Sequence, residues 1–307
     1  MRSSRFAVTL GLSLAVLTAV SVARTPDGQF ERTLQVSGPA DLEVLTHSGD
    51  ITVRAGQAGS VSIRGKIFVG DRWFSGSRRG DVSELEKNPP IRQSGNAIKI
   101  DYPAMHNIAI DYEITVPAET SVRAHSGSGN QTMDGIHAKL DLEAGSGDLR
   151  LSSIQGEVHA HTGSGNIDVR DLAGPFTADA GSGDIRLDAR GAGDIRVHTG
   201  SGNIQLQDVK GTLRAEAGSG DVNVGGAQTG EWEVRTGSGN ITLRLPEQAA
   251  YDLQASTGSG RVVADQPVSM TVQGDVQRSR EHSINGKVHG GGPLLMVHTG
   301  SGDVHIQ

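Results

Sequence analysis

The chain has no cysteine among its 307 residues, few aromatic residues and no apolar run longer than the one near its start. Without cysteine it cannot form a disulfide, bind zinc through thiolates or use a thiol nucleophile. Aromatic residues make up only 3% of the sequence, so any core must be thin and aliphatic. Glycine is abundant, with 43 residues, about twice its usual share. The glycines recur at fixed positions between alternating apolar residues, which argues against disorder.

Residues 1–23 have the pattern of a secretory signal peptide. Arg2 and Arg5 precede a mostly apolar stretch from Phe6 to Val20, and Ser21-Val22-Ala23 provides small residues for cleavage. The apolar stretch covers 15 residues, fewer than the ~20 that a membrane-spanning helix needs. We therefore expect an exported protein of the periplasm or cell surface, with no stable transmembrane span after cleavage. A retained anchor is the alternative.

The charge balance argues against a nucleic-acid partner. Loss of the two positive charges of the signal lowers the formal net charge from −7 to −9, and the remaining Lys and Arg form no basic patch. An acidic chain without such a patch is poorly suited to a polyphosphate.

The tripeptide Gly-Ser-Gly recurs at an almost constant spacing. It begins at residues 127, 145, 163, 181, 200, 218, 237, 258 and 300. A period near 18 residues is typical of a solenoid. Apolar and polar residues alternate on both sides of each tripeptide, so each repeat predicts two half-buried strands. The expected fold class is all-β: a single-stranded parallel β-solenoid (β-helix) with two-strand coils of ~18 residues.

Less regular segments flank the repeats and divide the chain into five parts. We expect a signal peptide at 1–23, an N-terminal cap with irregular first coils at 24–120, the regular solenoid at 121–261, an excursion at 262–292 and a final coil at 293–307. His47-Ser48-Gly49-Asp50-Ile51 looks like a degenerate copy of the repeat, and Ser83–Lys87 predicts a short helix. Solenoids need atypical units that cover their open ends, and we expect 293–307 to form the outer edge.

Two positions of the repeat alternate in chemistry from copy to copy. Three residues after the first glycine, amide and acid take turns at Asn130, Asp148, Asn166, Asp184, Asn203, Asp221 and Asn240. Two residues before it stand His125, Glu143, His161, Asp179, His198, Glu216 and Arg235. In coils ~4.8 Å apart, adjacent like charges would cost ~0.9 kcal/mol even in water. The alternation avoids this cost, and the second set is the candidate interaction row of a rigid polar face.

Other candidate chemistry is less specific. The units Gly181–Leu187 and Gly191–Val197 are similar to calcium-binding β-roll turns, but asparagine replaces the acid in alternate copies. We expect no cofactor, with calcium as the alternative. His159-Ala160-His161 places two imidazoles on one strand face without a third metal ligand at a fixed spacing, so we expect no metal site. Arg79-Gly80-Asp81 matches a cell-attachment tripeptide, and we interpret it as a coincidence.

Catalysis by a β-helix is the main alternative function. Polysaccharide lyases and hydrolases on this architecture need acid and base groups that converge on one bond. Asp148, Asp184 and Asp221 would lie two coils apart, roughly 9.6 Å, but a regular repeat creates no unique site. We therefore expect no catalytic residues.

The repeated Gly-Ser-Gly-Asp-Ile-Arg-Leu unit, the strand Tyr112-Glu113-Ile114-Thr115-Val116-Pro117 and the Gly-Gly-Gly-Pro-Leu before the last repeat carry a family resemblance. They resemble the bacterial β-strand-repeat family labelled "putative adhesin", a domain of unknown function. The resemblance covers nearly all of the chain after the signal and implies no catalytic residues. Arg261 departs from the Asp or Asn found at its position. We expect a non-enzymatic cell-envelope or surface interaction module with a glycan, cell-wall or protein ligand.

Overall fold

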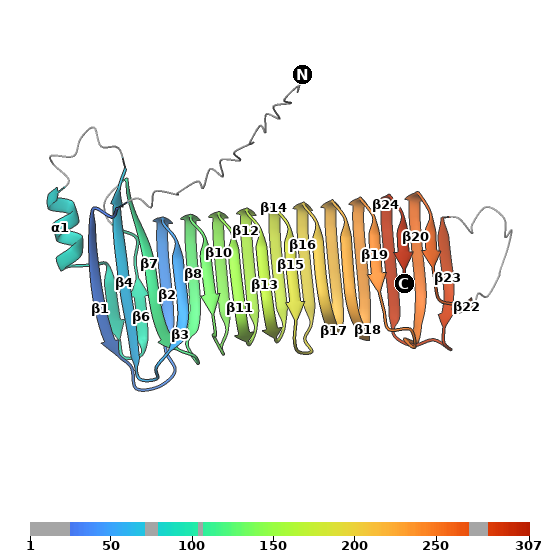
Figure 1. Cartoon of the computed structure of the whole chain (residues 1–307), viewed down its shortest axis with the longest axis horizontal. Coiled ribbons are helices and arrows are strands. Elements are labelled where there is room, and N and C mark those ends of the chain that lie inside the picture. Colours follow the sequence, from blue (N-terminus) through green and yellow to red (C-terminus); the bar gives the residue numbers. More distant parts are fainter. Residues whose placement is uncertain (1–24, 71–78, 104–106, 270–281) are drawn as a thin grey trace, which may run out of the picture.

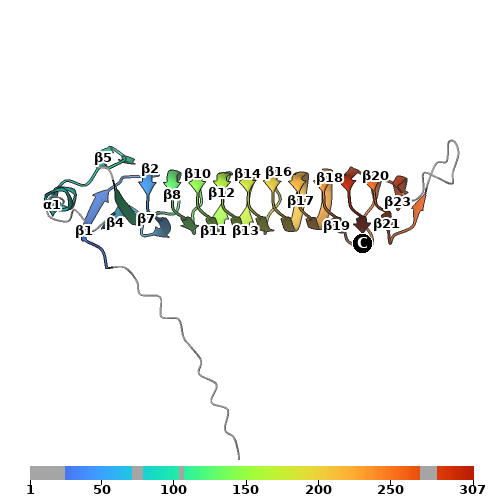
Figure 2. The same ribbon diagram turned by 90° about the horizontal axis from the view of Figure 1, so that it is seen from above.

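The computed structural model describes residues 25–70, 79–103, 107–269 and 282–307. The signal peptide predicted at 1–23 lies outside these residues. The described chain is almost entirely β-structure, arranged as a long, flat stack of mostly parallel strands (Figures 1 and 2). The all-β prediction is confirmed. None of the helices in the described ranges is long and apolar enough to cross a membrane.

Two layers of strands, here called wall A and wall B, face each other across a thin interior (Figure 2). Wall A contains β2 (Asp41–Ser48), β8 (Ser121–Ser128), β10 (Leu140–Ser146), β12 (Val158–Ser164), β14 (Phe176–Ser182), β16 (Ile195–Ser201), β20 (Tyr251–Ser259) and β24 (Leu294–Ser301). Wall B contains β3 (Ile51–Gly56), β9 (Gln131–Asp134), β11 (Leu149–Gln155), β13 (Ile167–Ala173), β15 (Ile185–Ala189), β19 (Ile241–Arg244), β21 (Val262–Ala264) and β25 (Val304–Ile306). The long strands β17 (Ile204–Ser219) and β18 (Val222–Ser238) run from wall B into wall A.

Strands within a wall pair in parallel and in register with the repeats on either side. Leu140, for example, lies between Val122 and Val158. The degenerate copy at residues 47–51 is confirmed as a repeat, because Ser48 pairs with Ser128 as later serines pair with each other. Equivalent side chains therefore form straight rows along the stack.

The Gly-Ser-Gly corner is glycine-rich because successive corners approach closely. Gly183 has a φ of 146°, a conformation that side chains other than glycine rarely adopt. A Cβ at Gly183 would also collide with the carbonyl oxygen of Gly165 in the preceding repeat. The tripeptide thus lets corners stack at strand spacing.

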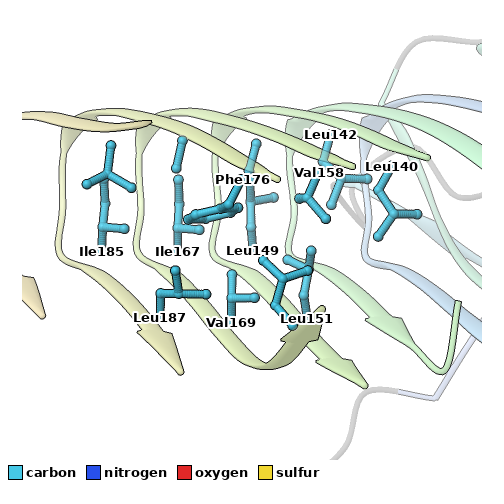
Figure 3. Close-up of a cluster of buried hydrophobic side chains, with 14 of the residues drawn as sticks. Leu140, Leu142, Leu149, Leu151, Val158, Ile167, Val169, Phe176, Ile185 and Leu187 are labelled. Atoms are coloured by element: carbon cyan, nitrogen blue, oxygen red, sulfur yellow. The ribbon is translucent and has the colours of Figure 1, made fainter. Parts of the chain in front are cut away.

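Apolar side chains from both walls fill the interior in rows along the stack (Figure 3). Leu149 and Leu151 of wall B and Val158 and Phe176 of wall A are all buried. Trp232, also fully buried, donates its indole N–H to the carbonyl of Gly211 at 3.0 Å. The alternating pattern in the sequence is therefore the in-out pattern of the strands.

The N-terminal end is closed by antiparallel strands and a helix. Wall B is extended by β7 (Ile108–Pro117), which pairs with β3, and then by β4 (Ser60–Val69) and β1 (Gly28–Gln35). Wall A is extended by the hairpin of β5 (Ile91–Ser94) and β6 (Ala97–Ile100), in which β6 pairs with β2. The helix predicted at Ser83–Lys87 is present as part of α1 (Arg79–Lys87). It buries Val82 and Leu85 over the open end, and Arg32 donates to the carbonyls of Glu86 and Lys87.

The C-terminal segment does not form the outer edge, so that expectation is wrong. β24 pairs with β18 on one side and with β20 on the other, and β25 lies likewise between β19 and β21. The last repeat of the chain is therefore the penultimate layer of the stack. The outer layer is β20 and β21, covered on wall A by the antiparallel strands β23 (Ser283–Val288) and β22 (Val268–Ser269). The inserted strand keeps the common register, because Leu295 is the partner of both Trp232 and Leu253.

Candidate interaction surface

The structure brings all seven residues of the predicted interaction row into one line on the outer face of wall A. We call this line the contact row: His125, Glu143, His161, Asp179, His198, Glu216 and Arg235. Neighbours in the contact row are register partners on adjacent strands. His125 Nδ1 lies 3.0 Å from Glu143 Oε2, and His161 Nδ1 lies 3.6 Å from Asp179 Oδ1.

The line continues beyond the seven residues to His298 and Ser256, which sequence reasoning missed. His298 is the register partner of both Arg235 and Ser256, and its Nδ1 lies 3.0 Å from the Ser256 hydroxyl. Both residues stand two positions before a Gly-Ser-Gly, at 300 and 258. That offset was a usable signal, but the order of the two repeats in the stack was not visible in the sequence.

Ion pairs link the contact row to the next outward position of the same strands. Arg214 contacts Glu216 at 2.7 Å and Glu233 at 3.3 Å, and Arg235 contacts Glu233 at 2.5 Å. These side chains are partly exposed, and exposed pairs contribute roughly 0–1 kcal/mol each. The face therefore carries charges of both signs, held in pairs that contribute little to stability.

A groove of about 650 Å³ lies at the N-terminal end of this face. The β5–β6 hairpin, β2, β8 and β10 contribute its lining, which includes four basic and three acidic side chains: Arg92, Lys99, Arg123, Lys139, Asp41, Glu43 and Asp141. Lys99 Nζ lies 3.0 Å from Glu43, and this hydrogen bond raises the pKa of Lys99. Arg123 lies 3.6 Å from Asp141. The repeat pattern did not indicate the groove, because it depends on the hairpin of residues 91–100.

The Asn/Asp positions form a hydrogen-bonded line at the Gly-Ser-Gly corner, which we call the turn ladder: Asp50, Asn130, Asp148, Asn166, Asp184, Asn203, Asp221, Asn240 and Asp303. Each side-chain Oδ1 accepts the backbone N–H of the next member at 2.8–3.0 Å. Asn166 also donates its amide to Asp148 at 3.4 Å. Asn130 donates to Asp50 and Asn203 to Asp184 in the same way, so the alternation supplies an amide donor to three of the carboxylates.

Arg261, the departure from the Asn/Asp pattern, lies at the end of the turn ladder. Its backbone N–H donates to Asp303 Oδ1 at 2.8 Å. The next residue begins β21, in the outer layer of the stack, and among the described residues no further corner takes an acceptor from this position. Only the order of the layers makes arginine acceptable here.

The structure places the remaining predicted candidates at separate positions. His159 Nε2 lies 2.9 Å from Glu157, which lowers the pKa of that carboxyl, and His161 faces Asp179 instead. Gly80 and Asp81 lie in the first turn of α1. Across the described ranges, no three His, Cys, Asp or Glu residues are grouped so as to hold a metal.

Two acids near the start of wall B have pKa values shifted in opposite directions. Burial raises the pKa of Asp111, whereas a hydrogen bond from Lys66 lowers the pKa of Glu113. Both acids are occupied within the fold: Asp111 accepts the Asp50 N–H at 2.9 Å, and Lys66 contacts Glu113 at 2.5 Å. They extend the scaffold and are not a separate site.

Comparison with known proteins gives a family and several solved folds. The sequence model of the Toastrack DUF4097 family matches residues 26–198 and 172–307. No curated protein matches the chain.

Three solved structures are similar over most of the chain. One is described as a putative adhesin from Bacteroides fragilis, with 12% identity, 92% of this chain and 99% of that chain covered, and a TM-score of 0.42. Another is described as a putative lipid binding protein from Parabacteroides distasonis, with 12% identity, 92% and 97% covered, and a TM-score of 0.46. A putative cell adhesion protein from Clostridium sporogenes has 14% identity, 91% and 98% covered, and a TM-score of 0.26.

Proposed function

The chain belongs to the Toastrack family, and we propose that it is a non-enzymatic, exported β-solenoid that acts as an interaction or scaffold module of the cell envelope or surface. Each coil of ~18 residues would supply one strand to each wall. The ligand would be a glycan, a cell-wall polymer or a protein that lies along wall A and contacts several coils at once.

The observation that carries this proposal is the contact row. Its side chains repeat at strand spacing, ~4.8 Å, on a backbone that every neighbouring coil holds in register. A rigid row contributes many weak contacts without a large loss of conformational entropy on binding. Linked weak contacts give an avidity far above that of any single one. The groove at the end of the same face offers a more enclosed starting point for an extended ligand.

The test is a binding screen of the purified chain against glycans and isolated cell-wall material. We expect binding that weakens as salt is raised, because exposed charges are screened. The triple variant E143Q/D179N/E216Q should bind more than about tenfold more weakly, since it removes every acid of the contact row at once.

A matched variant on wall B, D134N/D168N/D188N, changes the net charge equally and should bind as the wild type does. Equal losses of affinity in the two variants would mean that binding depends on net charge and not on the contact row. Binding that survives the wall A variant, or no binding to any material in the screen, would contradict the proposal.

A further inference from the structure

The outer face of wall B changes in character along the stack. In its earlier coils, charged side chains pair locally, as Arg150 does with Asp148 at 2.5 Å and Arg186 with Asp184 at 2.6 Å. In β17 and β18 the same outward positions carry uncharged amides at Gln205, Gln207 and Asn223. Gln205 and Asn223 are direct register partners.

The strand register is interrupted beside these amides. Leu206 pairs with Val224 and Val209 pairs with Gly226, which leaves Gln207 and Asp208 opposite Gly225 alone. Asp208 adopts a left-handed conformation with φ 55°. The same two-against-one interruption occurs between β13 and β15, where Asp171 is also left-handed. The β17–β18 bulge differs because the single residue opposite it is Gly225 and not a residue with a side chain.

Gly225 leaves a hollow where its neighbours carry long side chains. A Cβ built at Gly225 would meet no atom within 4 Å. The hollow has a volume of about 300 Å³, at the lower end of the range for small-molecule sites, roughly 300–1,000 Å³. Its lining includes Gln205, Gln207, Asp208, Asn223, Gly225, Gly226 and Arg244.

The polar groups around the hollow are not used by the fold. Within the described part of the chain, the side chains of Gln205, Gln207, Asp208, Asn223 and Arg244 have no hydrogen-bond or ion-pair partner. Arg244 is the register partner of Gly225 and contributes to the lining of the hollow. Three amides, one carboxylate and one guanidinium are thus available to a single ligand.

We propose that this hollow is a binding site for one acidic sugar unit, such as a uronic acid residue of a glycan. Amides both donate and accept hydrogen bonds, which matches neighbouring sugar hydroxyls, and Asp208 adds an acceptor. The guanidinium of Arg244 is shaped to hold a carboxylate through two parallel hydrogen bonds. The bare backbone of Gly225 and Gly226 allows the ring to approach the sheet closely. The site lies on wall B and does not depend on the contact row.

The direct test is an NMR titration of the 15N-labelled chain with sodium glucuronate, and with glucose as the neutral control. We expect saturable shifts of the side-chain NH2 signals of Gln207 and Asn223 and of the Gly225 amide. Glucose should bind about tenfold more weakly, as should glucuronate to R244Q, because a charge-assisted pair is lost. No saturable shift with glucuronate, or equal affinity for the two sugars, would overturn the assignment.

Substitution of Gly225 separates binding from folding. Gly225 is not in a left-handed conformation and its Cβ position is open, so G225F should fold, fill the hollow and abolish the shifts of Gln207 and Asn223. T177F adds the same ring to wall A and should bind glucuronate as the wild type does. The double variant Q207A/N223A keeps Gly225 and should bind at least tenfold more weakly if amides hold the hydroxyls. Wild-type affinity in G225F or in the double variant would overturn the site, whatever the outcome for wall A.

Discussion

The turn ladder and the contact row alternate with the same two-repeat period, but they differ in what their side chains bond. In the turn ladder each side-chain oxygen accepts a backbone N–H of the next coil, as Asn166 does from Asp184 at 2.9 Å. In the contact row the polar contacts between neighbouring residues join one side chain to another, as between His161 and Asp179 at 3.6 Å. The first alternation is part of the scaffold, whereas the second leaves the backbone unaffected. The period alone does not distinguish them; the bonded atoms do.

The largest difference should come from truncating one residue in each line. N166A removes the acceptor of the Asp184 N–H and a donor to Asp148, so we expect a loss of about 0.5–1.5 kcal/mol in the free energy of unfolding. H161A removes an exposed pair only, and should cost within about 0.5 kcal/mol. Urea denaturation of both variants measures this. Equal losses would mean that the contact row is also a structural element.

A smaller effect is expected at Asp111, which lies next to Asp50, the first member of the turn ladder. Asp111 Oδ1 accepts the Asp50 N–H at 2.9 Å, and burial raises the pKa of Asp111. A carboxyl with a raised folded-state pKa binds more protons when folded, so its contribution to stability falls as pH rises through that value. D111N keeps the oxygen and removes the charge. We expect D111N to be at least as stable as the wild type at pH 7.

The advantage of D111N should disappear below the ordinary pKa of 3.8, where the wild-type carboxyl is neutral in both states. Thermal unfolding from pH 3 to pH 8 checks the trend. A variant that is less stable than the wild type at pH 7 would show that the ladder needs the charge as well as the oxygen.

The smallest effect is expected at the other end of the ladder. Arg261 donates its backbone N–H to Asp303, and no corner of the described chain lies beyond it in the stack. R261N should therefore change stability by no more than about 0.5 kcal/mol. D303A removes the acceptor of that N–H, and we expect it to be the more destabilising of the two. Urea unfolding midpoints of the two variants give the order of their stabilities. If R261N were the less stable variant, the Arg261 side chain would have a structural role.

Much of the fold was predictable because the residues of each repeat indicate its strands, its inward faces and its corners. The alternation of residues such as Ile185 and Leu187 specified which side chains face inward, and Gly-Ser-Gly specified where corners stack. The contact row followed from counting offsets, since the register is constant. The same count predicts that His298 belongs to the row. It does not predict that His298 lies between Arg235 and Ser256, because that depends on the order of the layers.

The groove and the Gly225 hollow could not be predicted in this way. The groove requires the β5–β6 hairpin to lie beside β2, a contact between residues more than 50 positions apart. The hollow requires a register shift between β17 and β18, which no single repeat reveals. Both features arise where the repeat fails, and a period carries no information there.

The sequence by itself determined the strand period, the inward faces, the glycine corners and the two alternating lines, because these depend on interactions that recur every repeat. Tertiary structure alone decided the order of the layers, the insertion of β24 and β25, the role of Arg261 and the two concave sites. Parallel strands with the same apolar pattern can pair in several orders with similar local energy. Only the packing of the whole stack, with its connections and end caps, selects one of them.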